Sequence, residues 1–133
     1  MANAAPVGQF EQYVLTAVMA LHEQAYGVTI HTKVAELISP RQVSLGAVYA
    51  TLDRLEDKGF VASWLSDPTP ERGGRAKRHY KLEAPGERAL HESAVAAKRV
   101  VDHLEQLWGG DAWNPTRRWK PARLRSWTRS SAP

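Results

Sequence analysis

The chain has 133 residues, which suits one small domain with an appendage, and its 43% hydrophobic and 24% charged residues are ordinary for a globular protein. It has no cysteine, which excludes a disulfide framework, a thiolate zinc site and a thiol redox switch. Residues 1–6 lack the basic region of a signal peptide, and no apolar run has the ~20 residues of a membrane span. We therefore expect a cytoplasmic protein without a membrane span.

The first two helices are predicted from apolar residues at helical spacing. One covers residues 10–25 and is expected to stop at Gly27, since glycine often ends a helix. The next begins near Thr29 and ends at Ser39, because a residue that precedes proline disfavours the helical conformation. The buried side predicted for this second helix consists of Ile30, Val34, Leu37 and Ile38.

A third helix is predicted from Ser44, whose hydroxyl can accept a hydrogen bond from an unpaired amide, to Gly59. Its opposite side begins with very small residues, and Gly46 costs about 1 kcal/mol relative to alanine in a helix. Close approach to another surface would explain that cost. The surface is the major groove of DNA, which admits a helix, the second helix of this chain, or both. The predicted buried stripe of the third helix is Leu45, Val48, Leu52 and Leu55.

A hairpin with a basic tip is predicted after the third helix. Residues 60–66 and 77–82 are rich in aromatic and β-branched side chains and flank a Pro/Gly-rich turn, as hairpin strands do. The tip at 71–78 reads E-R-G-G-R-A-K-R, in which glycines let backbone amides approach phosphates and the cations flank them. A solvated charged loop has the same composition, but after a helix-turn-helix this hairpin indicates a DNA-binding wing.

The net charge of +4 supports a local contact with a polyanion. Most of the positive excess falls in the tail, and the body of the chain is near neutral apart from the run from Arg72 to Lys81. The predicted DNA contacts are Lys33, Ser44, Gly46, Ala47, Tyr49, Ala50, Thr51, Arg54, Arg72, Gly74, Arg75, Lys77, Arg78 and Tyr80. The alternative function is a winged-helix module that binds an acidic protein.

A fourth helix is predicted from Pro85 to Trp108, before Gly109. Its apolar residues recur at intervals of four and three, which is the heptad spacing of a helix–helix seam. The seam is longer than one small domain needs to cover its own core, so it predicts a dimer, with packing on the first helix of the same chain as the alternative. The seam residues are Leu90, Ala94, Ala97, Val101, Leu104 and Trp108.

The resulting fold is mostly α with a small β-hairpin. We expect a winged helix-turn-helix domain at 8–83, a C-terminal dimerisation helix at 84–108 and a basic tail with tryptophans at 109–133. The tail is expected to be disordered, with a DNA-backbone clamp or a lipid-binding segment as alternatives. No catalytic constellation and no metal-binding spacing of the five histidines is found, so we expect no enzyme, metal or cofactor.

Two motifs resemble the PadR-type transcriptional regulators. The segment 44–61, S-L-G-A-V-Y-A-T-L-D-R-L-E-D-K-G-F-V, is similar to that family's S-x-G-x-L-Y-x-x-L-x-R-L-E-x-x-G-L-I. The segment 73–82, G-G-R-A-K-R-H-Y-K-L, is similar to its G-G-x-x-R-K-Y-Y-x-L, and Tyr26-Gly27 resembles its Gly-Tyr in reversed order. The resemblance covers about residues 10–107, whereas Leu82 to Gly86 departs from the family's L-T-x-x-G by lacking the threonine.

The resemblance implies a homodimer that binds a palindromic operator, usually as a repressor. It also implies that the C-terminal helix packs on the partner's first helix, which would place Phe10 and Val14 in the interface. Many members are released from DNA by a small molecule, so an effector of unknown chemistry is a further expected partner.

Overall fold

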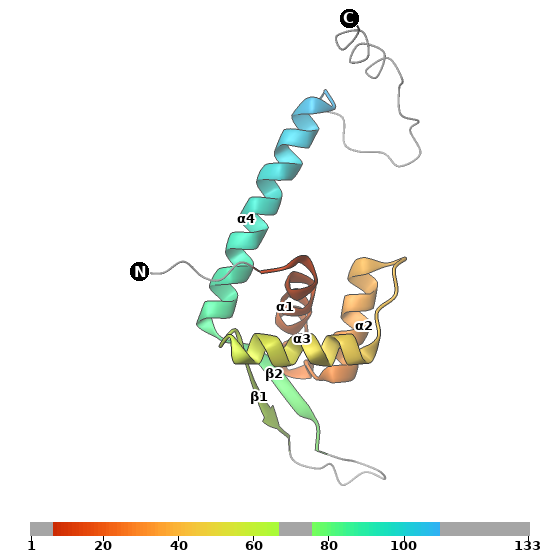
Figure 1. The fold of residues 1–133 in the computed structure, drawn as a ribbon, viewed down its shortest axis with the longest axis vertical. Coiled ribbons are helices and arrows are strands. Elements are labelled where there is room, and N and C mark those ends of the chain that lie inside the picture. Colours follow the sequence, from red (N-terminus) through yellow and green to blue (C-terminus); the bar gives the residue numbers. More distant parts are fainter. Residues whose placement is uncertain (1–6, 67–75, 110–133) are drawn as a thin grey trace, which may run out of the picture. The chain divides into compact units, whose positions relative to one another are not determined.

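The computed structural model describes residues 7–66 and 76–109 (Figure 1). The chain divides into two compact units, residues 1–97 and 98–133. The elements are α1 (Gln9–Leu21), the short 3-10 helix η1 (His22–Gln24), α2 (Gly27–Ile38), α3 (Leu45–Asp57), β1 (Val61–Leu65), β2 (Arg78–Leu82) and α4 (Ala84–Leu107). Their order and type confirm the predicted fold. Apart from Gly109, the predicted tail lies outside the described residues.

The first unit is a three-helix body with an antiparallel hairpin. The helices α1, α2 and α3 pack on one another, while β1 contacts α3 and β2 contacts α1 (Figure 1). Every one of these elements contributes apolar side chains to one core, and Ala89 and Leu90 from the start of α4 complete it. The architecture is therefore a winged helix-turn-helix. Helices α2 and α3 form the helix-turn-helix, and the β1–β2 hairpin is the wing.

The region around Gly27 differs from the prediction. Helix α1 already ends at Leu21, and Gly27 begins α2 instead of stopping the first helix. A Cβ added to Gly27 would lie 2.0 Å from the hydroxyl oxygen of Tyr49. The absence of a side chain at Gly27 therefore allows the Tyr49 ring to lie close to the start of α2, a contact between residues far apart in the sequence.

The buried side of α3 is turned relative to the prediction. Leu45 was expected in the core but is 38% exposed, whereas Thr51 is only 1% exposed. The buried hydroxyl of Thr51 is satisfied because it accepts a hydrogen bond of 3.1 Å from Nη2 of Arg54. On α2, Leu37 is likewise exposed, not buried. The centre of the outer face of α3 is therefore nearer to Asp53 than the sequence predicted, and Arg54 lies at the edge of that face.

Helix α4 is buried only near its start. Leu90 packs into the core of its own chain, and Val14 of α1 is fully buried there. The predicted placement of Val14 in a dimer interface is therefore wrong, because its side chain is already enclosed by its own domain. The later seam positions Val101, Leu104 and Trp108 are all at least 36% exposed. In the part of the chain that the structure describes, no helix is long and apolar enough to cross a membrane.

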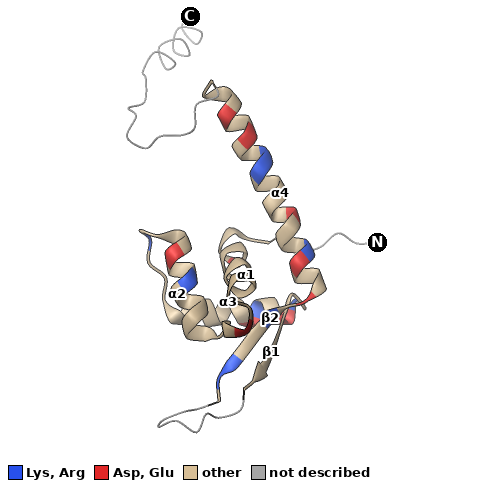
Figure 2. Ribbon diagram, turned by 180° about the vertical axis from the view of Figure 1, so that it is seen from behind, with Lys and Arg blue, Asp and Glu red and all other residues tan. Residues whose placement is uncertain are grey.

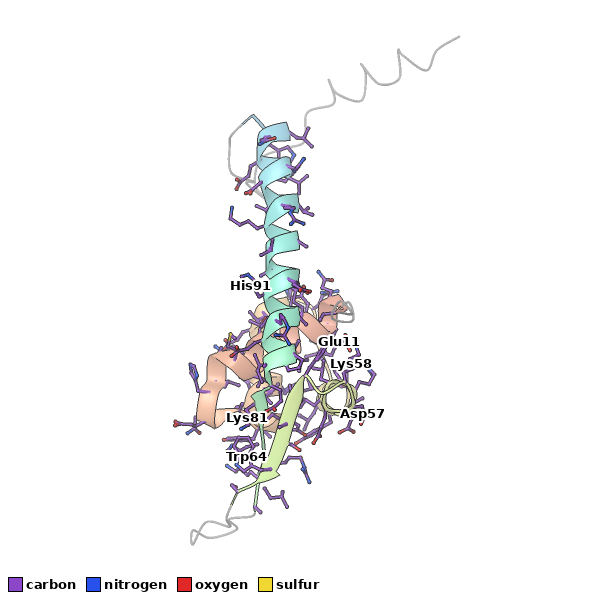
Figure 3. All side chains as sticks on the ribbon, turned by 90° about the vertical axis from the view of Figure 1, so that its left-hand side faces the viewer. Glu11, Asp57, Lys58, Trp64, Lys81 and His91 are labelled. Carbon is purple, nitrogen blue, oxygen red and sulfur yellow. The ribbon has the colours of Figure 1, made fainter. Side chains whose placement is uncertain are left out.

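An ion pair joins the start of α1 to the end of α3. Nζ of Lys58 lies 3.0 and 2.9 Å from the two carboxylate oxygens of Glu11, which also accepts a hydrogen bond from the Gly8 amide (Figure 3). Burial alone would raise the pKa of Glu11, but the bonds from Lys58 and Gly8 together with the charges of Lys58 and Arg54 lower it below its ordinary value. The pair therefore favours the folded state while the carboxylate is charged.

Glu11→Gln should remove part of the pH dependence of folding. Because the folded pKa is the lower one, the pair's contribution is full above the unfolded pKa of about 4.3 and disappears as the pH falls through the folded value. Urea unfolding at pH 7 should show a loss of about 1–2 kcal/mol in Glu11→Gln. Between pH 5 and 3 the variant should lose less stability than the wild type. Glu36→Gln, in an exposed pair with Lys33, should leave both curves in place.

Candidate nucleic-acid interface

The turn between α2 and α3 is fixed by side chains from both helices. Oγ of Ser44 accepts a hydrogen bond of 3.0 Å from the Ala47 amide, which confirms the predicted N-cap. Nε2 of His31 lies 2.7 Å from the Val43 carbonyl and donates to it, so α2 holds the residue just before the cap. These two bonds determine where α3 begins and how it leaves the turn.

The start of α3 presents a surface of small residues. Gly46 and Ala50 are exposed, Ala47 is half-buried, and Tyr49 is 40% exposed beside them. A Cβ added to Gly46 would meet no atom within 4 Å. The alternative that Gly46 allows α2 and α3 to pack closely is therefore wrong, since α2 does not approach it. Within the described chain, nothing uses the space that this glycine leaves open.

The wing is connected to α3 by a relay of hydrogen bonds. Nη1 of Arg78 donates to Oγ of Ser63 over 2.9 Å, and Ser63 donates to Oε2 of Glu56 over 2.8 Å. The serine hydroxyl thus links a cation of β2 to a carboxylate of α3. Local periodicity gives no sign of this relay, because its three residues come from three different elements.

Aromatic side chains connect the wing to the start of α2. The rings of Trp64 and His79 are stacked with centroids 5.6 Å apart, and His79 meets Tyr26 edge-on at 5.4 Å. Nζ of Lys77 lies 4.3 Å from the centre of the Tyr26 ring, and the Tyr80 amide donates to the Ala25 carbonyl. Trp64 is visible on the hairpin in Figure 3. The hairpin therefore has a defined orientation relative to the helix-turn-helix.

Most of the predicted DNA contacts that the structure describes lie on one of two surfaces, the start of α3 and the wing. Lys77 and Arg78 are exposed on the wing, and β2 carries positive charge in Figure 2. Lys33 is paired with Glu36 at 3.2 Å on α2. The predicted tip residues Arg72, Gly74 and Arg75 lie outside the described residues.

Two of the residues predicted to contact DNA are buried in the domain and are therefore not part of the candidate surface. Thr51 and Tyr80 are 1% and 2% exposed, so their side chains do not reach a phosphate in this fold. Burial is the main reason that the pKa of Tyr80 lies above its ordinary value. Both residues are part of the core beneath the surface on which the sequence predicted them.

A hollow of about 360 Å³ lies beside the turn between α2 and α3. The side chains of Phe10, Tyr13, Ile38 and Val43 give it an apolar lining, and Arg41 lies at its wall. This volume is in the range of small-molecule pockets. Across residues 7–66 and 76–109, no cluster of three or more His, Asp or Glu residues is arranged to hold a metal ion.

The sequence of this domain matches the model of the Transcriptional regulator PadR-like family over residues 15–92. The chain belongs to the PadR-like family. Its PadR-like fold is similar to that of a PadR family transcription regulator from Clostridium difficile, with a TM-score of 0.60, 22% identity, and coverage of 77% of this chain and 100% of that one. A PadR-like transcriptional regulator from Bacillus cereus gives a TM-score of 0.61 at 22% identity, with 76% and 92% covered.

A structure from outside the PadR group also matches this PadR-like chain. The Orc1 protein of Aeropyrum pernix, solved in complex with DNA, gives a TM-score of 0.54 and 25% identity, and the match covers 69% of this chain and 26% of that chain. A comparison with curated proteins gives no match. Family membership makes this protein a transcriptional regulator.

Proposed function

We propose that this PadR-like regulator is a homodimeric repressor that binds a palindromic operator. Helix α3 enters the major groove, and the wing lies along the phosphate backbone. The observation that carries the proposal is the exposed start of α3, where Gly46 and Ala50 leave space that the described chain does not fill. A major groove about 12 Å wide admits a helix whose first residues are small enough to approach the base edges.

The charges of the wing support this placement. Lys77 and Arg78 are exposed on the wing, and the sequence between the two strands contains Arg72 and Arg75. Cations that contact phosphates position a protein on DNA without reading its sequence. The relay from Arg78 through Ser63 to Glu56 fixes this guanidinium relative to α3, so the backbone contact and the groove contact are set together.

The exposed seam of α4 supports the dimer. Its apolar residues Val101, Leu104 and Trp108 are between 36% and 49% exposed and recur at heptad spacing. A contiguous apolar stripe of this kind in a soluble protein usually marks an interaction site. A second copy provides the same stripe, and two-fold symmetry would place two copies of α3 about 34 Å apart, one turn of DNA.

A salt titration with duplex DNA tests the proposed function. Fluorescence anisotropy with a labelled duplex selected from random sequences should give a binding constant that falls with salt, with a logarithmic slope near 0.9 for each phosphate contacted. A random duplex should bind more weakly, about 10³-fold or more at physiological salt. Binding to an acidic protein without binding to any duplex would favour the protein-interaction alternative.

Gly46→Ala should change stability and DNA binding in opposite directions. The added methyl group has open space in the free protein and removes the glycine penalty, so unfolding should require up to about 1 kcal/mol more free energy. In the complex the same methyl group would enter the gap between helix and bases, and we expect operator affinity to fall about tenfold. Denaturant unfolding and anisotropy measure the two effects. Unchanged affinity in the stabilised variant would place this face away from DNA.

A further inference from the structure

The outer face of α3 carries a carboxylate where the sequence predicted a cation. At about 100° per residue, Gly46, Ala50, Asp53 and Asp57 fall within about 60° of one another. All four are exposed, whereas the core side of the helix is formed by Val48, Thr51, Leu52 and Leu55. Asp53 follows Ala50 by ~4.5 Å along the helix axis. A groove that receives the small residues therefore also receives Asp53.

Arg54 does not share that position. Its guanidinium donates to the buried Thr51 hydroxyl, and its charge contributes to lowering the pKa of Glu11 on α1. These contacts place it on the α1 side of the helix.

Among the residues that the structure describes, the carboxylate of Asp53 has no partner that would neutralise it. Glu56 on the same helix accepts from Ser63, and Glu11 is paired with Lys58. In the stretches 7–66 and 76–109, no hydrogen bond or ion pair holds the side chain of Asp53. An exposed, unpaired carboxylate on a DNA-facing helix is repelled by phosphates, so it is tolerated best toward the centre of the groove.

The chemistry of the groove floor limits what this carboxylate can bind. Guanine presents two acceptors and thymine presents one, and both repel a carboxylate. Adenine offers its N6 amino group, but the neighbouring N7 is an acceptor. Cytosine offers its N4 amino group without an adjacent acceptor on the same base, and Asp or Glu is a recognised partner for it.

On the basis of the proposed function, we propose that Asp53 is a specificity-determining residue that selects a cytosine in each operator half-site. The side chain accepts a hydrogen bond from the cytosine N4 amino group, while Gly46 and Ala50 allow the helix to come close enough. The negative charge also lowers affinity for every other base at this position. Asp53 therefore lowers non-specific affinity and sharpens selection.

The test compares the sequences selected from random duplexes by the full-length wild type, Asp53→Asn and Asp57→Asn. The two variants remove the same charge from the same face, one about 6 Å beyond the other. The wild type should select a cytosine at one fixed position of each half-site and lose about 5- to 30-fold in affinity when thymine replaces it. Asp53→Asn should reduce that ratio to about twofold and allow adenine, which an asparagine binds through N6 and N7.

The Asp57→Asn control separates a loss of base selection from a simple loss of repulsion between carboxylate and phosphate. Asp57→Asn should bind all duplexes slightly more tightly and select the wild-type motif. If Asp53→Asn also binds all duplexes more tightly by one common factor with an unchanged motif, Asp53 only repels phosphate and the inference is wrong. A wild type that selects no motif would overturn the proposed function itself, and this inference with it. Equal melting temperatures of the three proteins show that the differences come from the DNA contact.

Discussion

Gly86→Ala should destabilise the protein by about 3 kcal/mol, or prevent it from folding. Gly86 lies in the first turn of α4 and is buried. A Cβ added there would be 2.1 Å from the Phe60 carbonyl oxygen and 2.9 Å from the carbonyl carbon. Both are backbone atoms next to β1, and the same oxygen accepts a 2.9 Å hydrogen bond from the Glu83 amide. Since neither atom can move without displacing the hairpin, the strain is borne by the junction of wing and α4.

Gly46→Ala provides the matched comparison for this substitution. It makes the same chemical change in a helix, at a position where the added methyl group meets nothing within 4 Å. Urea unfolding followed by circular dichroism should therefore give shifts of opposite sign, with Gly46→Ala more stable than the wild type and Gly86→Ala much less stable. If the two variants unfold at the same urea concentration, helix propensity alone controls both sites and the close packing at Phe60 carries no weight.

The sequence predicted those features of the fold that depend on local pattern. Helical spacing, the Ser44 cap and the proline after Ser39 gave the end of α2 and the start of α3 correctly, because each of these signals acts within a few residues. The strand-like segments on either side of a Pro/Gly-rich turn predicted the wing and its position after α3, and the PadR-like motifs agree with that prediction. Even so, the family resemblance did not indicate why Gly86 is needed, since its neighbour Phe60 lies in another element.

The rest could not be predicted because it depends on which side of each helix the tertiary structure covers. The hydrophobic pattern predicted Leu45 as buried and Thr51 as exposed, which placed Arg54 near the centre of the expected outer face of α3. The structure has the opposite burial at both positions. A buried threonine is inconspicuous in a hydrophobic pattern, since it is accepted in the core only when its hydroxyl finds a partner. In the structure that partner is Arg54 itself, so one hydrogen bond both satisfies the buried hydroxyl and holds the arginine on the α1 side of the helix.

On α4 too, the sequence pattern does not show which positions are buried in the domain itself. The heptad spacing runs without interruption from Leu90 to Trp108, yet Leu90 belongs to the core of its own domain. Only the exposed later positions remain available to a second copy. A dimer contact in this protein is therefore expected to be short, and its loss should be measurable with a single substitution near the middle of the exposed part.

Leu104→Asp should convert the protein from a dimer to a monomer and weaken operator binding about 100-fold or more. Leu104 is 36% exposed on α4 at a heptad position between Val101 and Trp108. An aspartate there would put an unpaired charge into an apolar contact in each copy, and separating the helices returns both charges to water. Each monomer would then hold one half-site alone and lose the effective concentration that a linked second site provides.

Gln106→Asp adds the same charge to the same exposed region of α4, outside the heptad seam, and should leave both properties unchanged. Light scattering at micromolar concentration gives the mass of each variant, and anisotropy with whole and half operators gives the affinity. For Leu104→Asp the whole operator and the half-site should bind almost equally, because the reading helix is intact and only the linkage is lost. A Leu104→Asp protein that keeps the mass of a dimeric wild type would show that the dimer uses another surface. A monomeric wild type with full operator affinity would show that operator binding does not require the seam.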